Sequence, residues 1–277
     1  MKKKIKAGYQ GVEGSFSQEA MIQYFGEKIE TQNYKTFEDI FIAVKNNEIN
    51  YGVLPIENST TGSINLVYDL LEKYSLFIVG EVCISIVQNL IGNKEATLKD
   101  IKEIYSHPQG FEQSKKFIDS LGEIKYIHYH NTALSVKYIK DSGALEKGAI
   151  GSKRACEIND LKILKENIND SLNNKTRFII IESNMKNSME NNKITVGVKL
   201  KHEVGSLYKI LGEFYNRGIN LTKIESRPIG DGTFSYNFYI DLEGNLSDSN
   251  LKEALNQIEV GVEKLKIYGT YKKCEII

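Results

Sequence analysis

The sequence lacks tryptophan, has only three prolines in 277 residues and carries no excess of either charge. Lysine plus arginine equals aspartate plus glutamate at 36 each, so no net field favours nucleic acid or an anionic membrane. No apolar run reaches the roughly 20 residues that cross a bilayer. The lysine-rich start of the sequence, residues 1–6, is not followed by the apolar segment of a signal peptide. We expect a cytoplasmic protein without nucleic-acid or membrane partners.

Motifs that mark nucleotide or metal chemistry are also missing. The sequence contains neither the phosphate-binding pattern GxxxxGK[ST] nor the dinucleotide pattern GxGxxG. Its four histidines include one close pair, His128 and His130, and no cysteine near them completes a structural zinc site. We therefore expect a site built largely from uncharged polar side chains.

A polar segment at residues 183–192, SNMKNSMENN, is interpreted as a linker between two domains. In residues 1–182, apolar runs such as YGVLPI and EIYS alternate with helical patterns, which predicts parallel strands joined by crossover helices. The apolar run at residues 76–87 leads from one α/β lobe to a second, and RFIIIE at residues 177–182 leads back. We expect a two-lobed, periplasmic-binding-protein-like α/β domain with crossovers near residues 80 and 178 and a ligand cleft.

Residues 193–277 have a different pattern. Ile194 and Val196 begin an alternation typical of a half-buried strand, and apolar residues recur at helical spacing from Leu207. Asp-Gly at residues 231–232 predicts a hairpin turn. The complete order is βαββαβ, which predicts an α+β ferredoxin-like domain.

Five loops rich in serine, threonine, asparagine and glycine each precede a predicted helix. They are residues 11–17, 58–63, 106–109, 131–133 and 151–154. One such loop alone is typical of a helix cap, because its side-chain oxygens accept bonds from backbone N–H groups. Loops after parallel strands face the ligand side of a sheet, and helix N-termini bind anions. The five together favour a pocket for a carboxylate-bearing molecule.

The order of these motifs resembles the prephenate dehydratase family along nearly the whole sequence. The matching stretches are YQGVEGSFSQEA at residues 9–20, GVLPIENSTTGSI at 52–64, SHPQ at 106–109 and NKTRFIII at 174–181. The last is similar to the motif that holds the family's catalytic threonine, which falls on Thr176. The C-terminal part resembles an ACT domain, with GSLYKIL from residue 205 and NLTKIESRP from residue 220.

The resemblance implies that prephenate loses water and carbon dioxide together to give phenylpyruvate, a step of L-phenylalanine biosynthesis. It implies no cofactor and no metal. Thr176 would be the catalytic residue and would donate a hydrogen bond to the departing hydroxyl. The substrate-binding residues implied are Ser15, Asn58, Ser59, Thr61, Ser106, Gln109, Thr132, Arg177 and Phe178.

Three charged or titratable residues near these motifs have more than one interpretation. Glu57 beside a dianionic substrate is electrostatically unfavourable, so we favour a structural role in which it caps backbone amides over a role as an acid. His107 precedes a proline in a tight loop, and a direct role in the chemistry stays open. Arg177 should alternate away from Thr176 on a strand, which favours a salt bridge over a substrate clamp.

The ACT resemblance implies that phenylalanine binds as an effector between two ACT domains, and hence a homo-oligomer, either a dimer or a tetramer. Glu225 would pair with the ammonium group of the effector. The full set of implied effector residues is Gly205, Ser206, Leu207, Asn220, Leu221, Glu225 and Ser226. Whether the effector inhibits or activates stays open.

Two alternative functions also stay open. The substrate could be arogenate, which carries an amino group in place of the keto group, and an additional acidic group in the cleft would favour it. The chain could instead be a non-catalytic sensor of carboxylates or amino acids, since two α/β lobes with hydroxyl-rich loops also describe solute receptors. The expected absence of export counts against such a receptor.

Overall fold

The computed structural model describes residues 5–275 except residues 172, 231 and 233–234. The chain forms two compact units, each assembled from separate segments. Unit 1 comprises Met1–Ile40, Val53–Gly62 and Cys83–Phe178, and unit 2 comprises Phe41–Gly52, Ser63–Val82 and Ile179–Ile277. Four strands contribute residues to both units, so neither unit is one continuous stretch. They are β3 (Tyr51–Asn58), β4 (Gly62–Ser63), β5 (Phe77–Ser85) and β11 (Lys175–Glu182). The domain boundaries expected from the sequence stay a prediction.

The first lobe begins with a β-α-β arrangement in unit 1. β1 and β2 pair in parallel from Lys6↔Glu30 to Gln10↔Tyr34, with α1 between them in the sequence. β1 is flanked by β2 and β3 in the sheet. The elements of this part of the chain are β1 (Lys6–Gln10), α1 (Phe16–Phe25), β2 (Glu30–Tyr34), α2 (Phe37–Lys45), β3 (Tyr51–Asn58) and β4 (Gly62–Ser63).

The second lobe, also in unit 1, is a five-stranded sheet in the order β10-β6-β9-β7-β8. Its elements are β6 (Asn89–Gly92), η1 (Leu98–Asp100), β7 (Glu103–Ser106), α4 (Pro108–Glu112), α5 (Lys115–Asp119), β8 (Lys125–His128), α6 (Thr132–Ser142), β9 (Lys147–Gly151), α7 (Lys153–Ile158) and β10 (Lys162–Lys165). β7 is parallel to β8 and β9, but β6 is antiparallel to β9 and to β10. The expectation of parallel strands is confirmed for β7, β8 and β9 but is wrong for β6, which follows the preceding strand without a crossover helix.

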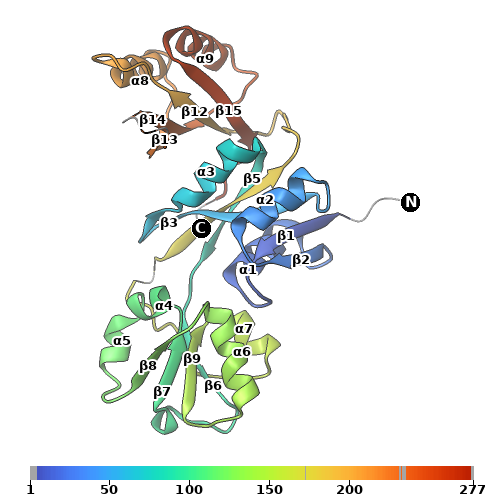
Figure 1. Cartoon of the computed structure of the whole chain (residues 1–277), viewed down its shortest axis with the longest axis vertical. Helices are drawn as coiled ribbons and strands as arrows, with labels where there is room; N and C mark the ends of the chain where they lie inside the picture. Colours follow the sequence, from blue (N-terminus) through green and yellow to red (C-terminus); the bar gives the residue numbers. More distant parts are fainter. Residues whose placement is uncertain (1–4, 172, 231, 233–234, 276–277) are drawn as a thin grey trace. The chain divides into compact units, whose positions relative to one another are not determined.

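Both faces of this second sheet are covered by helices. Leu90, Ile104 and Ile150 pack against Ile118 of α5 on one face, while their neighbours along the strands pack against Val136 of α6 on the other. Figure 1 shows α4 and α5 on one side of the strands and α6 and α7 on the other. A sheet buried on both faces explains why its strands are apolar at successive positions.

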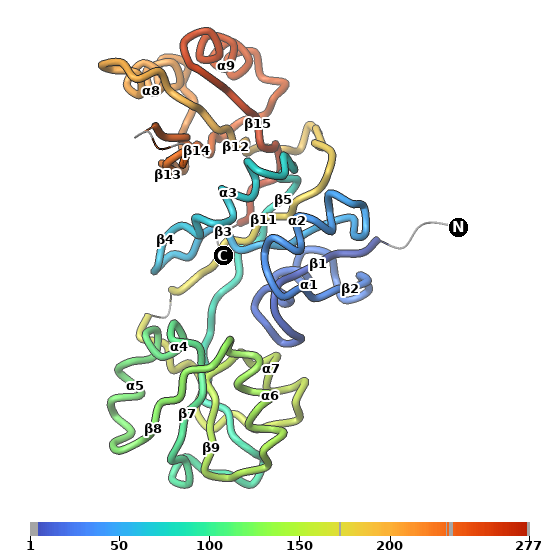
Figure 2. Tube along the Cα trace, in the orientation of Figure 1, coloured from blue at the N-terminus to red at the C-terminus, as the bar shows by residue number. Residues whose placement is uncertain are grey.

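The C-terminal part of unit 2 has the predicted βαββαβ order. Its elements are β12 (Lys193–Lys199), α8 (Ser206–Asn216), β13 (Leu221–Pro228), β14 (Tyr236–Glu243), α9 (Ser249–Gly261) and β15 (Lys264–Tyr271). The strand order β13-β14-β12-β15 is that of a ferredoxin-like sheet. In Figure 2, α8 and α9 lie on the same side of these strands, and Phe214 and Ile258 from the two helices share one core with Ile194 and Ile240. Of the expected hairpin turn, Asp231 lies outside the described residues.

Unit 2 also contains helix α3 (Asn65–Tyr74) and most of β5 (Phe77–Ser85), together with the second half of β11 (Lys175–Glu182). β15 pairs with β5 in parallel at Gly269↔Ile78. A side chain at Gly269 would lie within 2.0 Å of the Ile78 carbonyl oxygen, so only glycine fits this close approach. Among the described residues, no helix is both long and apolar enough to cross a membrane.

Candidate active site

Asn58, at the end of β3, organises the turn that follows it. Its Oδ1 accepts bonds from the backbone N–H groups of Thr60, at 2.9 Å, and Thr61, at 3.0 Å. The hydroxyl of Thr61 donates to the same oxygen at 3.3 Å. The alternative of a helix cap does not hold for this loop, because α3 begins later and its N-cap, Ile64, makes no side-chain cap bond. The polar group instead folds a turn at the end of a strand.

The other end of the Asn58 side chain reaches the motif that contains the predicted catalytic residue. Asn58 Nδ2 donates to Asn174 Oδ1 at 2.7 Å and to Thr176 Oγ1 at 2.9 Å. It also lies 3.2 Å from the carbonyl oxygen of Lys175. Thr176 is 7% exposed. The Thr176 oxygen accepts this bond from Asn58, so the bond does not use the hydrogen of the Thr176 hydroxyl.

Ser59 fastens the same turn to the strand that carries Thr176. Its hydroxyl accepts from the backbone N–H of Lys175 at 2.9 Å and lies 3.2 Å from the carbonyl oxygen of Asn173. Its backbone N–H donates to the Lys175 carbonyl at 2.8 Å. Ser59 therefore holds the two segments in register, whatever contact it makes with a ligand.

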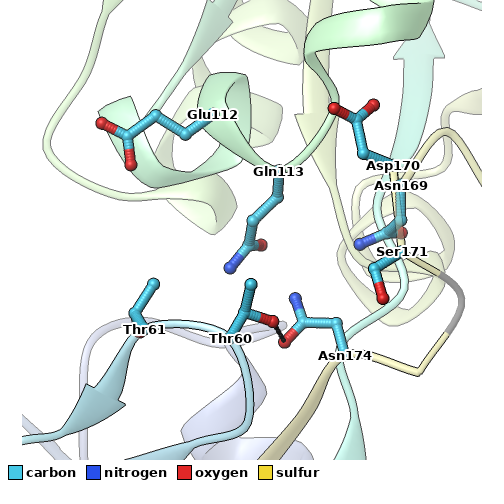
Figure 3. Close-up of a pocket in the computed structure, with 8 residues that line it drawn as sticks. All are labelled: Thr60, Thr61, Glu112, Gln113, Asn169, Asp170, Ser171 and Asn174. Atoms are coloured by element: carbon cyan, nitrogen blue, oxygen red, sulfur yellow. Dashed lines mark hydrogen bonds between the residues drawn. The ribbon is translucent and has the colours of Figure 1, made fainter.

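A cavity opens beside this turn, with about 480 Å³ of empty space that includes open solvent. Its lining comes from the turn, from the end of α4 and from the polar segment before β11. The lining residues are Thr60, Thr61, Glu112, Gln113, Asn169, Asp170, Ser171 and Asn174. Figure 3 shows Gln113 extending toward Thr60 and Asn174 across the cavity. Thr176 is not among the lining residues and is connected to the cavity through Asn58 and Asn174.

The second lobe contributes Gln109 to the turn, as expected. Gln109 Nε2 donates to Thr61 Oγ1 at 3.3 Å. Ser106 is fully buried and its hydroxyl has no hydrogen-bond partner among the described residues. A Cβ at Gly110 would lie 2.3 Å from Ser106 Oγ and 3.5 Å from the methyl group of Thr132, which places these three residues together.

His107 begins helix α4. Its Nδ1 accepts the backbone N–H of Gln109 at 3.2 Å, with Pro108 at the first helical position. Burial lowers the pKa of His107; Glu112 opposes that effect, and His128 lowers the pKa further. The His107 imidazole accepts a backbone bond as the cap of α4, and this structural role explains its presence at the helix start.

Three further predicted substrate residues have structural contacts. Ser15 caps α1 by accepting from the Gln18 N–H at 3.4 Å. Arg177 forms a salt bridge with Glu57, through Nη2 at 2.9 Å and Nε at 3.1 Å from the same carboxylate oxygen. The interpretation of Arg177 as a salt-bridge residue is confirmed. Phe178 is 2% exposed and belongs to the core.

Two of the remaining loops cap helices as their composition suggests. Asn131 caps α6 by accepting from the Leu134 N–H at 2.7 Å. Ser152 caps α7 by accepting from the Ala155 N–H at 3.0 Å. The Ser152 hydroxyl also donates to the Gly14 carbonyl at 2.9 Å, which joins the loop after β1 to the second lobe.

Sequence reasoning did not single out the amides that surround the cavity. Gln88 donates through Nε2 to Gln113 Oε1 at 3.2 Å, and its backbone N–H donates to Asn169 Oδ1 at 2.6 Å. Asn174 accepts from Asn58 and from the Thr60 hydroxyl, the latter at 3.2 Å. The signal that could have found them is the density of asparagine just before β11, with four between residues 167 and 174.

The predicted effector residues lie around the first turn of α8 and along β13. Gly205 is the N-cap of α8 with φ +80°, a left-handed conformation suited to glycine, and it provides no side-chain cap. Ser206 donates to the carbonyl groups of Lys201 and Glu203 at 2.8 and 2.9 Å. Leu207 and Leu221 are half-buried, Ser226 is exposed and Asn220 donates to Glu243 Oε2 at 2.9 Å.

The profile of the family "Prephenate dehydratase" matches residues 7–186, and the profile "ACT domain" matches residues 194–260. The chain belongs to the prephenate dehydratase family. The prephenate dehydratase of Methanocaldococcus jannaschii is 39% identical over 266 residues, which cover 93% of this chain and 94% of that protein. The reaction of the family is that of a carbon–oxygen lyase, and the second profile identifies the βαββαβ domain as an ACT domain.

Solved structures agree with this family in fold. The prephenate dehydratase of Arthrobacter aurescens, in complex with L-Phe, is 27% identical with a TM-score of 0.87, over 97% of this chain and 90% of that one. GqqA, described as a novel type of quorum quenching acylase, is 30% identical with a TM-score of 0.88, over 97% of this chain and 98% of that one. The predicted fold class is confirmed.

The contact between Glu57 and Arg177 gives a test of the role of Glu57. We expect Glu57→Gln to lower the thermal unfolding midpoint, because Arg177 is only 12% exposed in its side chain and would lose a charged partner. We expect kcat for prephenate to stay within about fivefold of the wild type. Circular dichroism melting and phenylpyruvate formation measure the two effects, with Glu123→Gln, at a solvent-exposed carboxylate of the second lobe, as the control. A loss of kcat of more than a hundredfold at an unchanged midpoint would instead assign Glu57 to the chemistry.

Proposed function

We propose that the chain converts prephenate to phenylpyruvate at the site around Asn58 and Thr176, in the biosynthesis of L-phenylalanine. The observation that carries this assignment to the site is the bond network of the Asn58 carboxamide. It brings the predicted catalytic hydroxyl within 2.9 Å of a fixed amide and ties both to a cavity. A cytoplasmic location stays a prediction.

The reaction is an elimination that makes an aromatic ring. The bond between the ring and its carboxylate breaks, and its electron pair forms a ring double bond. The carbon–oxygen bond on the opposite side of the ring breaks, and the oxygen leaves with its electron pair and takes up a proton to become water. Thr176 donates a hydrogen bond to this oxygen as negative charge develops on it. Its hydroxyl pKa is too high for ionisation, so it acts as a donor or relays a proton.

Neutral donors suit this chemistry because prephenate carries two carboxylates. Amide and hydroxyl groups fix the substrate without forming an ion pair with the carboxylate that must leave. A bond from Asn58 Nδ2 to Thr176 Oγ1 polarises the hydroxyl and orients its hydrogen away from Asn58. Preorganised donors of this type require no rearrangement when charge develops.

Replacing Thr176 by alanine tests the donor. We expect Thr176→Ala to lower kcat by about 10²–10³-fold with little change in KM, the typical effect of losing one positioned donor. Thr176→Ser keeps the hydroxyl and should retain most of the activity. Phenylpyruvate formation from prephenate, followed by its alkaline absorbance, measures both variants. Normal turnover by Thr176→Ala would exclude this donor.

Arogenate is the second candidate substrate, and one feature of the cavity favours it. Asp170 and Glu112 both line the cavity and bring negative charge near the ligand. Asp170 Oδ1 accepts from the Lys116 N–H at 2.9 Å, which fixes its carboxylate. Arogenate carries an ammonium group where prephenate carries a keto group, so a carboxylate in the cavity would attract it.

The ratio of kcat/KM for the two substrates tests this candidate. We expect Asp170→Asn to lower kcat/KM for arogenate about fivefold relative to that for prephenate, since an exposed ion pair contributes up to about 1 kcal/mol. Asp119→Asn, at a carboxylate of the same lobe outside the cavity lining, is the matched control. An equal change for both substrates would remove Asp170 from substrate choice.

The ACT domain supports phenylalanine as the effector, because the relative from Arthrobacter aurescens is in complex with L-Phe. A homo-oligomer stays the expected assembly. The effector carboxylate would meet the start of α8 at Gly205, where no side chain caps the backbone amides. Its ammonium group would compete for Glu225, whose carboxylate accepts from the Ser63 hydroxyl. Whether two or four chains assemble stays a prediction.

Ser63 connects this effector region to the segment just after the substrate turn. Its hydroxyl donates to Glu225 and accepts from Lys223 Nζ at 2.7 Å. Asp69 of α3 forms a two-point salt bridge with Arg227, at 2.8 and 3.2 Å. In the sequence, Ser63 follows Thr61 after one residue. A change at β13 therefore acts on a residue two positions from the turn.

A second contact fixes α3 to the ACT domain at Glu72. Its carboxylate accepts from Lys264 at 2.7 Å, from Lys266 at 3.2 Å and from the Tyr268 hydroxyl. Burial alone would raise the pKa of Glu72, but the bonds from Lys264, Tyr268 and Lys266 outweigh it and lower the pKa to about 2. Glu72 is therefore ionised at neutral pH, and its bonds join α3 to β15.

Removing the Ser63 hydroxyl tests this coupling. We expect Ser63→Ala to bind phenylalanine, as measured by calorimetry, but to show less than half of the wild-type change in activity on saturation with it. The control is Ser120→Ala. Within the part of the chain that the structure describes, the Ser120 hydroxyl bonds only to the nearby Phe117 carbonyl, at 2.6 Å. An unchanged phenylalanine response in Ser63→Ala would place the coupling elsewhere.

A further inference from the structure

One buried polar atom beside the cavity has no partner in the described part of the chain. Asn174 is 3% exposed, and its Nδ2 makes no hydrogen bond to any described residue. A buried amide N–H without an acceptor costs free energy, and native structures keep few of them. The group is therefore expected to have an acceptor in the working state of the protein.

The orientation of this amide is fixed by a chain of bonds that starts at the backbone. The N–H groups of Thr60 and Thr61 hold Asn58 Oδ1, so Asn58 must present Nδ2 to Asn174. Asn174 can accept that bond only through Oδ1, which also accepts from the Thr60 hydroxyl. A flipped Asn174 amide would set two NH₂ groups against each other. Nδ2 of Asn174 is therefore the atom directed away from Asn58.

Asn174 lines the cavity, and Figure 3 shows its amide nitrogen directed from the turn toward the side of Gln113. We propose that Asn174 is a substrate-binding residue whose Nδ2 donates a hydrogen bond to a carboxylate oxygen of the bound substrate. This inference rests on the proposed function and deepens it. A carboxylate suits this position because Asn174 Nδ2 is a buried donor without an acceptor in the described part of the chain, and a dianionic substrate supplies one.

The carboxylate would lie beside Thr60 and Asn174, and in Figure 3 the two acidic lining residues, Glu112 and Asp170, lie above them. The donors that would hold an anion are thus separate from the acidic residues that would repel one. This arrangement also places the substrate carboxylate at a residue two positions before Thr176 in the sequence, and Thr176 is bonded to the same Asn58 nitrogen. One amide thereby sets the position of both the binding donor and the catalytic hydroxyl.

The variant Asn174→Asp changes one atom of the network. The remaining oxygen still accepts from Asn58 and Thr60, but a carboxylate oxygen replaces the NH₂ group and repels the substrate. We expect KM for prephenate to rise at least about tenfold, the effect of one lost bond to a charged group, with kcat within about threefold. Burial disfavours the charged carboxylate, so the rise in KM should shrink as the pH is lowered and the new carboxyl group becomes a donor.

The matched control is Asn173→Asp, which adds the same charge one residue away at an exposed side chain. Its KM should stay within twofold of the wild type at each pH. A purely structural role for Asn174 predicts a lower unfolding midpoint and a loss of activity that does not recover at low pH. That result, or equal KM values for the two variants, would overturn the proposal. If Asn174→Asp does not fold, Asn174→Ala removes the donor without adding charge, and a KM within twofold of the wild type would overturn the proposal equally.

Calorimetric titration with phenylpyruvate separates this inference from the proposed function. Phenylpyruvate carries a carboxylate and needs no turnover to bind. If the wild type does not convert prephenate, the proposed function is refuted. A Kd for phenylpyruvate at least about tenfold weaker in Asn174→Asp than in Asn173→Asp would even then support the binding role. Equal Kd values in the two variants, with normal wild-type turnover, would refute the binding role alone.

Discussion

The carboxamide of Asn58 is the interaction on which the site depends. One end of it is held by two backbone N–H groups of its own turn, and the other end reaches Asn174 and Thr176, 116 and 118 positions away in the sequence. An amide has one accepting and one donating end, so fixing the first determines the direction of the second. The turn after β3 therefore sets the geometry of β11 without any charged group.

A site of this kind solves an electrostatic problem. A substrate with two carboxylates would bind strongly to arginine or lysine, but a strong ion pair with the carboxylate that leaves would stabilise the ground state and slow its loss. Arg177, one of the two cations that flank Thr176 in the sequence, is instead paired with Glu57. The pair neutralises this positive charge, and the cavity lining consists of hydroxyls and amides together with the carboxylates of Glu112 and Asp170.

The regulatory half shows a contrasting use of charge. Helix α3 is joined to the ACT strands by Asp69 with Arg227, by Glu72 with two lysines and by Ser63 with Glu225. Several of these bonds are short and partly shielded from water, and together they make α3 part of the same compact unit as the ACT domain. In the proposed regulation, an effector bound at β13 would act on Ser63, two positions from the turn after β3.

The sequence alone determined the ACT domain element by element, because alternation and helical spacing are local properties of the chain. The order of the motifs also determined the family, and the structure brings Thr176 to the polar loop after β3. Only the tertiary structure decided that β6 runs antiparallel to both β9 and β10. It also decided that the loop after β3 folds a turn in place of a helix cap, and that Arg177 pairs with Glu57. It alone identified Asn174, since the direction of an amide depends on partners distant in sequence. Periodicity records which side of an element is buried, whereas hydrogen-bond direction is set by groups that meet only after the chain has folded.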